Sequence, residues 1–323
     1  MANRLPLLSV VVPVFHNAET LDELFERIRA TLEPHASELS YEVIFVEDRS
    51  TDDTWKVLQA LREKFPRQVT LVRLVRNFGQ VAALLAGYRT AAGDCCVSMA
   101  ADLQDPPELI RDMFVAWRAG HPLVAAARAA RNDGFVNDVV SATSWWVLRR
   151  FAVAGIPDGG FDYFLMDRKV LQHYVTDPEP HIFMQGRLLY FVREPHLISY
   201  ERAKRPRGTS RTSFWRRLKY FIDAFTAYSF FPLRLMSALG LFISLLAFLA
   251  AVAIVVVTLM FGAKVEGWAS LSVVMLFLSG IQLLSLGVIG EYLWRAVQGV
   301  QKRPHYLVEE TLPKEQGAPP DAR

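Results

Sequence analysis

Two side chains able to bind a metal ion follow a short apolar run in the middle of the chain. The run 95–99 has no polar alternation, which is typical of a strand buried on both faces of a parallel sheet. Asp102 and Gln104 come shortly after it, in AADLQDPP, where open α/β sheets bind ligands. Two residues apart on an extended chain, they would point oxygen atoms to the same side, and hard oxygen ligands suit Mg²⁺ or Mn²⁺ on a diphosphate. On this stretch alone, a strand end capped by solvated polar side chains is the favoured interpretation.

A second carboxylate has the same kind of position. Asp48 directly follows the carboxyl end of the predicted strand 42–47, in VEDRSTDDTW. The four polar residues 50–53 are enough to cap the helix that follows, so Asp48 is not needed as a cap and is left over for another role. It could accept an N–H of a nucleobase, and a helix-capping loop is the alternative.

The elements that must position these carboxylates alternate along the chain up to about residue 130. This rhythm predicts a doubly wound α/β domain with a mostly parallel sheet. Beyond Arg128 the pattern weakens into a helix over 139–151 and a loop, and the tail after Glu310 is expected to be disordered. Strands are expected over 8–15, 42–47, 70–74, 95–99 and 123–127, and helices over 21–32, 53–64, 80–91 and 108–119.

The C-terminal third has the composition of a membrane protein. Residues 235–263 and 267–290 carry no charge, and each run exceeds the roughly 20 residues that cross a bilayer. Two buried helices of a soluble domain are disfavoured because apolar residues run all round each helix. The connection 262–267 is short and the outer flanks are basic, so we expect a hairpin with both termini in the cytoplasm.

The stretch before the hairpin is strongly basic, although the net charge of the chain is only +3. Residues 201–219 hold eight basic residues and one acid, which predicts an anionic partner near the membrane. The stretch 213–231 fits an interfacial amphipathic helix.

A series of stretches in the same order resembles glycosyltransferase family 2. Within that family the similarity is to the polyprenyl-phosphate glycosyltransferases, which include dolichyl-phosphate mannosyltransferase and bacterial undecaprenyl-phosphate sugar transferases. No single stretch would suffice, but the ordered series covers nearly the whole chain. The stretches are SVVVPVFHN, VEDRSTDDTW, RNFGQVAALLAGYRTAAGD, AADLQDPPELI, FDYFLMDRKV, RGTSR and GVIGEYLWRAVQGVQKRPHYLVEE.

The resemblance implies a GT-A fold, which is Rossmann-like, and a site for a nucleotide sugar. Asp102 and Gln104 would bind Mg²⁺ or Mn²⁺ on the diphosphate of the donor. The residues implied to hold the nucleotide are Pro13, Val14, Phe15, Asn17 and Asp48.

The resemblance also implies a site for a phosphorylated lipid acceptor. Asp162, in FDYFLMDR, matches the acid beside the acceptor phosphate that is given the catalytic role. A basic loop would close over the donor diphosphate and the lipid phosphate, and its matching residues are Arg202, Arg205, Ser210 and Arg211.

Three features depart from the family pattern. The family usually has an acid two residues before Asp102, and this chain has Ala100, so one metal carboxylate is missing. The usual Asn-Glu after the first strand is replaced by His16 and Asn17. The Gln-x-x-Arg-Trp segment of processive polysaccharide synthases is absent, which favours transfer of one sugar over polymerisation.

The expected activity is inverting transfer of a single sugar from a nucleotide sugar, expected to be UDP-linked, to a polyprenyl phosphate such as undecaprenyl phosphate. The expected place is the cytoplasmic face of the inner membrane. An inactive membrane scaffold or partner subunit is the alternative that Ala100 supports. A flippase component is disfavoured because two helices without an intramembrane charge make a poor pathway.

The expected organisation follows from these assignments. The partners are the nucleotide sugar, the polyprenyl lipid and the membrane, without nucleic acid, and a homo-oligomer is left open. The predicted divisions are a GT-A domain over 1–210, a juxtamembrane helix over 211–233, two transmembrane helices over 234–298 and a cytoplasmic tail over 299–323.

Overall fold

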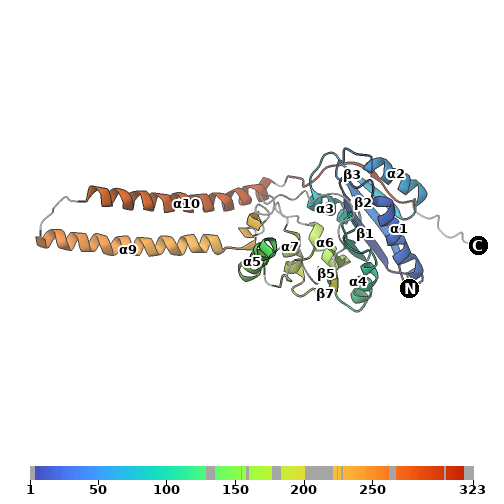
Figure 1. The fold of residues 1–323 in the computed structure, drawn as a ribbon, viewed down its shortest axis with the longest axis horizontal. Coiled ribbons are helices and arrows are strands. Elements are labelled where there is room, and N and C mark those ends of the chain that lie inside the picture. Colours follow the sequence, from blue (N-terminus) through green and yellow to red (C-terminus); the bar gives the residue numbers. More distant parts are fainter. Residues whose placement is uncertain are drawn as a thin grey trace, which may run out of the picture.

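The protein consists of a globular α/β part from which two long helices project side by side (Figure 1). This computed structural model describes residues 4–128, 135–153, 155–157, 160–176, 183–200, 221–223, 225–226, 228–261, 267–301 and 303–315.

The globular part is built on one eight-stranded sheet in the order β7-β5-β6-β4-β1-β2-β3-β8. Strands β4, β1, β2 and β3 are parallel, whereas β6 lies antiparallel between β4 and β5. Strand β5 and its parallel neighbour β7 run in the same direction as β4, and β8 is antiparallel to β3. The sheet is therefore mostly parallel, as expected, with β6 and β8 as its antiparallel strands. Its strands are β1 (Leu7–Val14), β2 (Ser40–Glu47), β3 (Val69–Leu74), β4 (Cys95–Ser98), β5 (Leu123–Arg128), β6 (Phe164–Asp167), β7 (His196–Tyr200) and β8 (Val308–Leu312).

Helices cover both faces of this sheet, which confirms the doubly wound plan. Val10 and Val12 of β1 belong to one buried cluster, together with residues of α1, α2 and α4. Val11 belongs to the other, with residues of α3, α6 and α7. The helices are α1 (Leu21–Leu32), α2 (Thr54–Lys64), α3 (Gln80–Thr90), α4 (Leu109–Arg118), α5 (Phe135–Phe151), α6 (Arg168–Thr176), α7 (Met184–Phe191), α9 (Phe231–Phe261) and α10 (Trp268–Gln301).

The first half of the chain follows the predicted elements closely. The five predicted strands lie within two residues of β1 to β5, and the four predicted helices lie within one residue of α1 to α4. In α1 the buried residues Leu21, Leu24, Phe25, Ile28 and Leu32 follow the pattern i, i+3, i+4, i+7, i+11, as one helix face requires. Helix α5 begins four residues before the predicted 139–151.

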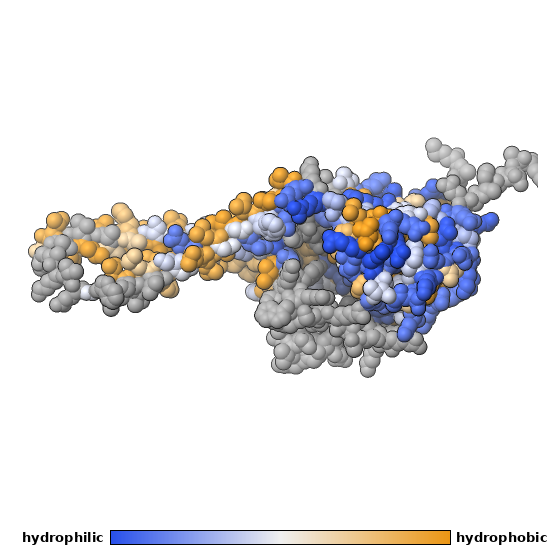
Figure 2. Space-filling view, turned by 90° about the horizontal axis from the view of Figure 1, so that it is seen from above, coloured by the Kyte–Doolittle hydropathy of each residue, from blue (hydrophilic) through white to orange (hydrophobic). Residues whose placement is uncertain are grey.

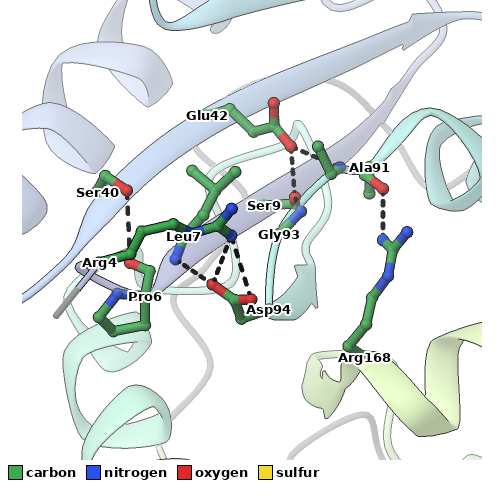
Figure 3. Close-up of polar contacts among 11 residues, drawn as sticks. Arg4, Pro6, Leu7, Ser9, Ser40, Glu42, Ala91, Gly93, Asp94 and Arg168 are labelled. Carbon is green, nitrogen blue, oxygen red and sulfur yellow. Dashed lines mark hydrogen bonds and ion pairs between the residues drawn. The ribbon is translucent and has the colours of Figure 1, made fainter. Parts of the chain in front are cut away.

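A buried polar network fixes the amino ends of the central strands (Figure 3). The Glu42 carboxylate of β2 accepts hydrogen bonds from Ser9 Oγ at 2.6 Å and from Ala92 N–H at 2.8 Å. Ser9 Oγ in turn accepts the N–H of Gly93 at 2.8 Å. A Cβ at Gly93 would lie 2.6 Å from that hydroxyl oxygen, so only glycine fits. The network sets the register of β1, β2 and β4, whose opposite ends carry the predicted site.

The two long helices have the dimensions and surface of a membrane hairpin. By length and composition, 231–254 and 277–301 are apolar enough to cross a bilayer, and neither window is buried in the protein. Figure 2 shows the hydrophobic residues gathered over these helices and the hydrophilic ones over the globular part. Ser285 of α10 lies 3.7 Å from the Met236 sulfur of α9. Of the predicted interfacial helix 213–231, residues 221–223, 225–226 and 228 are helical, and residues 213–220, 224 and 227 lie outside the described residues.

The prediction of a disordered tail after Glu310 is wrong for residues 311–315. Strand β8 pairs antiparallel with β3, and the N–H of Lys314 donates to Thr70 Oγ1 at 3.0 Å. The Lys314 ammonium also forms an ion pair with Glu42. Without β8 the outer edge of β3 would present unpaired backbone groups, so the chain after α10 returns to close that edge of the sheet.

Candidate functional site

Three adjacent loops at the carboxyl ends of β1, β2 and β4 hold strained backbone. Among the described residues, the non-glycine residues with positive φ are His16 (56°), Arg49 (60°) and Leu103 (60°). One follows each of these neighbouring strands. A side chain in this region costs on the order of 1–3 kcal/mol, and such strain clusters at functional sites. The three loops together therefore form the candidate site.

The loop after β4 is a turn, so the expected extended chain from Asp102 to Gln104 is wrong. The Gln104 N–H donates to Asp102 Oδ1 at 3.2 Å, as in an Asx turn, and Leu103 between them is buried in the core. Packing of Leu103 selects the left-handed turn that local sequence did not reveal. Asp102 and Gln104 are nevertheless both half-buried while their neighbours are buried.

The chemistry of Asp102 and Gln104 fits a divalent cation shared with a substrate. A carboxylate and an amide oxygen are hard ligands, and Mg²⁺ is commonly held by one or two carboxylates together with substrate phosphates. The described part of the chain contains no group of three or more His, Cys, Asp or Glu side chains that could hold a metal by itself. With Asp102 and Gln104 as ligands, a substrate diphosphate would supply further oxygen ligands to the cation.

Two buried tyrosines fasten this loop to the rest of the site. Tyr200 Oη, at the end of β7, donates to Asp105 Oδ1 at 2.7 Å, and Tyr163 Oη donates to the Pro106 carbonyl at 3.0 Å. The two rings meet edge to face with centroids 6.2 Å apart. Burial raises the pKa of Tyr163 well above its ordinary value, so its hydroxyl keeps its proton and donates. Sequence reasoning missed both tyrosines, because their partners lie far away in the chain.

Asp162, the predicted catalytic acid, is exposed and is held by a buried amide. Gln185 Nε2 donates to Asp162 Oδ1 at 2.8 Å and to the Phe161 carbonyl at 3.0 Å. Gln185 lies in the first turn of α7 and is buried, while Asp162 faces solvent. Asp162 is also directly followed by Tyr163, so its segment is joined to the loop of Asp102. Gln185 was not predicted, since nothing local distinguishes it.

Asp48 already has partners within the protein. Its side chain is 3% exposed, and its two oxygens accept the N–H groups of Phe78 and Gly79 at 2.7 and 2.8 Å. Burial raises the pKa of the Asp48 carboxyl above its ordinary value, although the two N–H bonds act in the opposite direction. Asp48 was expected to be left over after capping, but it holds the loop between β3 and α3. Each carboxylate oxygen keeps a second lone pair for a ligand.

The remaining predicted nucleotide residues lie beside Asp48. Pro13 and Val14 of β1 are paired with Val46 and Glu47 of β2, directly before Asp48. Phe15 is partly exposed, and its N–H donates to Asn17 Oδ1 at 3.1 Å.

His16, which replaces the usual family residue, links the loops after β1 and β2. Its N–H donates to Ser50 Oγ at 3.0 Å, and its Nε2 accepts the N–H of Thr51 at 3.1 Å. Its ring stacks on Phe15 with centroids 4.1 Å apart. The predicted nucleotide residues are therefore brought together, whereas Arg202, Arg205, Ser210 and Arg211 lie outside the described residues.

Comparison with known proteins places this fold among sugar transferases. Residues 9–175 match Glycosyl transferase family 2. An uncharacterized glycosyltransferase of Synechocystis is 37% identical over 304 residues, which are 94% of this chain and 95% of that protein. The prophage-derived bactoprenol glucosyl transferase of Shigella flexneri is 34% identical over 305 residues, 94% of this chain and 98% of that protein. A solved mannosyltransferase from Pyrobaculum calidifontis, in complex with GDP-Man and Mn²⁺, is 18% identical with a TM-score of 0.48, over 93% of this chain and 89% of that one.

Proposed function

Since this chain belongs to glycosyltransferase family 2, we propose that it transfers one glucose unit from UDP-glucose to a polyprenyl phosphate, with inversion, at the cytoplasmic face of the inner membrane. Glycosyl transfer and the GT-A fold follow from the family. The sugar and the lipid are proposed because relatives along nearly the full length are named bactoprenol glucosyl transferases.

One observation carries the proposal within the structure. The loop of Asp102, the segment of Asp162 and the end of β7 are joined by Tyr163 and Tyr200. The same chain then continues into two helices long and apolar enough for a bilayer. A site for a charged donor on a chain with a membrane-sized hairpin suits a reaction in which one substrate is a lipid.

Charge control is the main chemical demand on this site. The acceptor phosphate is already an anion at neutral pH, so it needs little help from a base, whereas two phosphorylated substrates must be held together. A divalent cation on Asp102 and Gln104 would offset the charge of the donor diphosphate. We assign Arg202, Arg205, Ser210 and Arg211 to the phosphates as a proposal from the sequence.

Asp162 is proposed to orient the acceptor phosphate or to take its last proton. Its exposure leaves the carboxylate accessible, and the bond from Gln185 fixes one of its oxygens. Pro13, Val14, Phe15, Asn17 and Asp48 are proposed to hold the nucleotide.

The test uses the full chain purified in detergent. The protein is incubated with undecaprenyl phosphate, Mg²⁺ or Mn²⁺, and a panel of labelled nucleotide sugars that includes UDP-glucose and GDP-mannose, and label is counted in the lipid phase. We expect label from UDP-glucose and its loss in Asp162→Asn. If label comes from another donor and not from UDP-glucose, the proposed sugar is wrong and that donor identifies the right one. No label from any donor would contradict the proposed reaction and favour the inactive scaffold.

A further inference from the structure

We propose that β8, the strand that follows the second long helix, supports the donor-nucleotide site from outside it, and that Glu309 is the positioning residue through which it acts. This inference rests on the proposed function, because it assigns the loop of Asp48 to the donor. Glu309 would hold that loop in its binding conformation without touching the substrate.

After α10 the chain returns to the β3 edge of the sheet, where β8 pairs with β3 (Figure 1). The carbonyl of Leu307 accepts the N–H of Val75 at 3.1 Å, and Val308 pairs with Leu74 at the carboxyl end of β3. Val75 begins the loop whose Phe78 and Gly79 N–H groups hold the Asp48 carboxylate. The returning segment therefore supports one side of Asp48 through the backbone.

Glu309 supports the other side through charge. Its carboxylate forms an ion pair with Arg49, the residue directly after Asp48, and lies 3.5 Å from Arg73 Nε. The same Arg73 nitrogen lies 3.2 Å from an oxygen of Glu47, directly before Asp48. The other Glu47 oxygen accepts the N–H of Ser50. One carboxylate on β8 thus joins the residues on both flanks of Asp48.

The loop needs such support for two physical reasons. Arg49 has a left-handed backbone conformation that disfavours any side chain. Glu47 is completely buried next to the buried Asp48, and two adjacent carboxylates repel unless cations lie nearby. Arg73 supplies such a cation beside Glu47, and Glu309 pairs with both Arg73 and Arg49 and so fixes where their guanidinium groups lie.

The test is Glu309→Gln, which keeps the shape of the side chain and removes its charge. We expect KM for UDP-glucose and the dissociation constant for UDP to rise about fivefold, the factor for a partly exposed ion-pair network, with kcat nearly unchanged. Glu310→Gln is the matched control. It removes the same charge one residue later in the same strand, and Glu310 has no ion pair among the described residues; it should leave both constants unchanged.

A second variant separates positioning from general surface charge. Arg49→Gly removes the guanidinium and allows the left-handed backbone without strain. In that background Glu309→Gln should have a much smaller effect on KM, because the Arg49 guanidinium that pairs with Glu309 is absent. Equal elution of all variants from a size-exclusion column in detergent checks that they fold.

The outcomes distinguish this inference from the proposed function. If wild type labels lipid but Glu309→Gln has unchanged KM and UDP affinity, or alters kcat alone, the positioning role is overturned. Equal effects of Glu309→Gln and Glu310→Gln would also overturn it, in favour of a general charge effect. If wild type transfers label to lipid from none of the donors, the proposed reaction fails. The UDP titration alone then decides the role of Glu309.

Discussion

At the level of single residues, buried polar side chains fix the segments that carry the candidate reactive groups. Gln185 holds Asp162, and Tyr200 holds Asp105 beside the loop of Asp102. Buried polar groups are costly unless they are hydrogen-bonded, so these pairs fix geometry firmly. The site therefore depends on residues that need not touch substrate.

Asp102→Asn should reduce turnover by about three orders of magnitude, because a bound cation contributes several kcal/mol and each 1.36 kcal/mol is about tenfold in rate. Ala100 leaves Asp102 as the carboxylate implied to bind the cation. The measurement is lipid-linked sugar formed per unit of protein, with Asp112→Asn on the exposed face of α4 as control. Full activity of the wild-type protein in excess chelator would show that the reaction needs no bound cation.

Tyr200→Phe should lower both thermal stability and kcat. The substitution removes a 2.7 Å hydrogen bond to a carboxylate that is 2% exposed, and such a loss costs about 1–3 kcal/mol. Tyr163→Phe removes a bond to a neutral carbonyl and should cost less. Thermal unfolding in detergent and transferase rates for both variants check this order, and a Tyr200→Phe protein with wild-type stability would contradict it.

At the level of elements, the carboxyl ends of the strands are aligned by tight packing behind them. Helix α3 crosses β1 and β2 at Gly87, where a Cβ would lie 2.4 Å from Val11 Cγ1 and 3.0 Å from Val46 Cγ2. Valine side chains are stiff and cannot swing aside. The close approach of α3 also places its first turn beside Asp48.

Gly87→Ala should therefore destabilise the globular part by about 1–3 kcal/mol, the usual cost of overpacking a core. The matched control is Gly299→Ala in α10, where a Cβ meets nothing within 4 Å. Melting temperatures of the two variants in the same detergent provide the measurement. A stabilised Gly87→Ala protein would show that α3 can move away from the sheet without penalty.

At the level of the whole molecule, the chain leaves the globular part through α9 and returns to it after α10. Because β8 joins the same sheet as β1, the two helices must begin and end on the same side of any membrane they cross. The basic residues that flank the hairpin then favour the cytoplasm for that side.

The topology can be tested with reporter fusions. A reporter at the C-terminus should be cytoplasmic, and a reporter in the connection 262–267 should face outside, because positive charge is retained on the cytoplasmic side. Fusions that retain transferase activity serve as the control for insertion. A C-terminus that external protease cleaves in intact cells would contradict the arrangement.

The sequence alone determined the features that depend on local patterns. Strands β1 to β5 and helices α1 to α4 could be predicted, because burial on both faces of a sheet and helical periodicity are read within a few residues. The apolar runs of α9 and α10 are local in the same sense. Their length and composition are enough to predict two long apolar helices.

Only the tertiary structure decided the features that pair distant residues. The antiparallel place of β6 and the return of β8 depend on which strand edges remain unpaired after the rest of the sheet has formed. Likewise, Gln185, Tyr200 and Glu309 acquire their roles from partners 23, 95 and 260 residues away. A buried polar side chain is stable only beside its partner, and the partner is fixed by packing rather than by the neighbouring sequence.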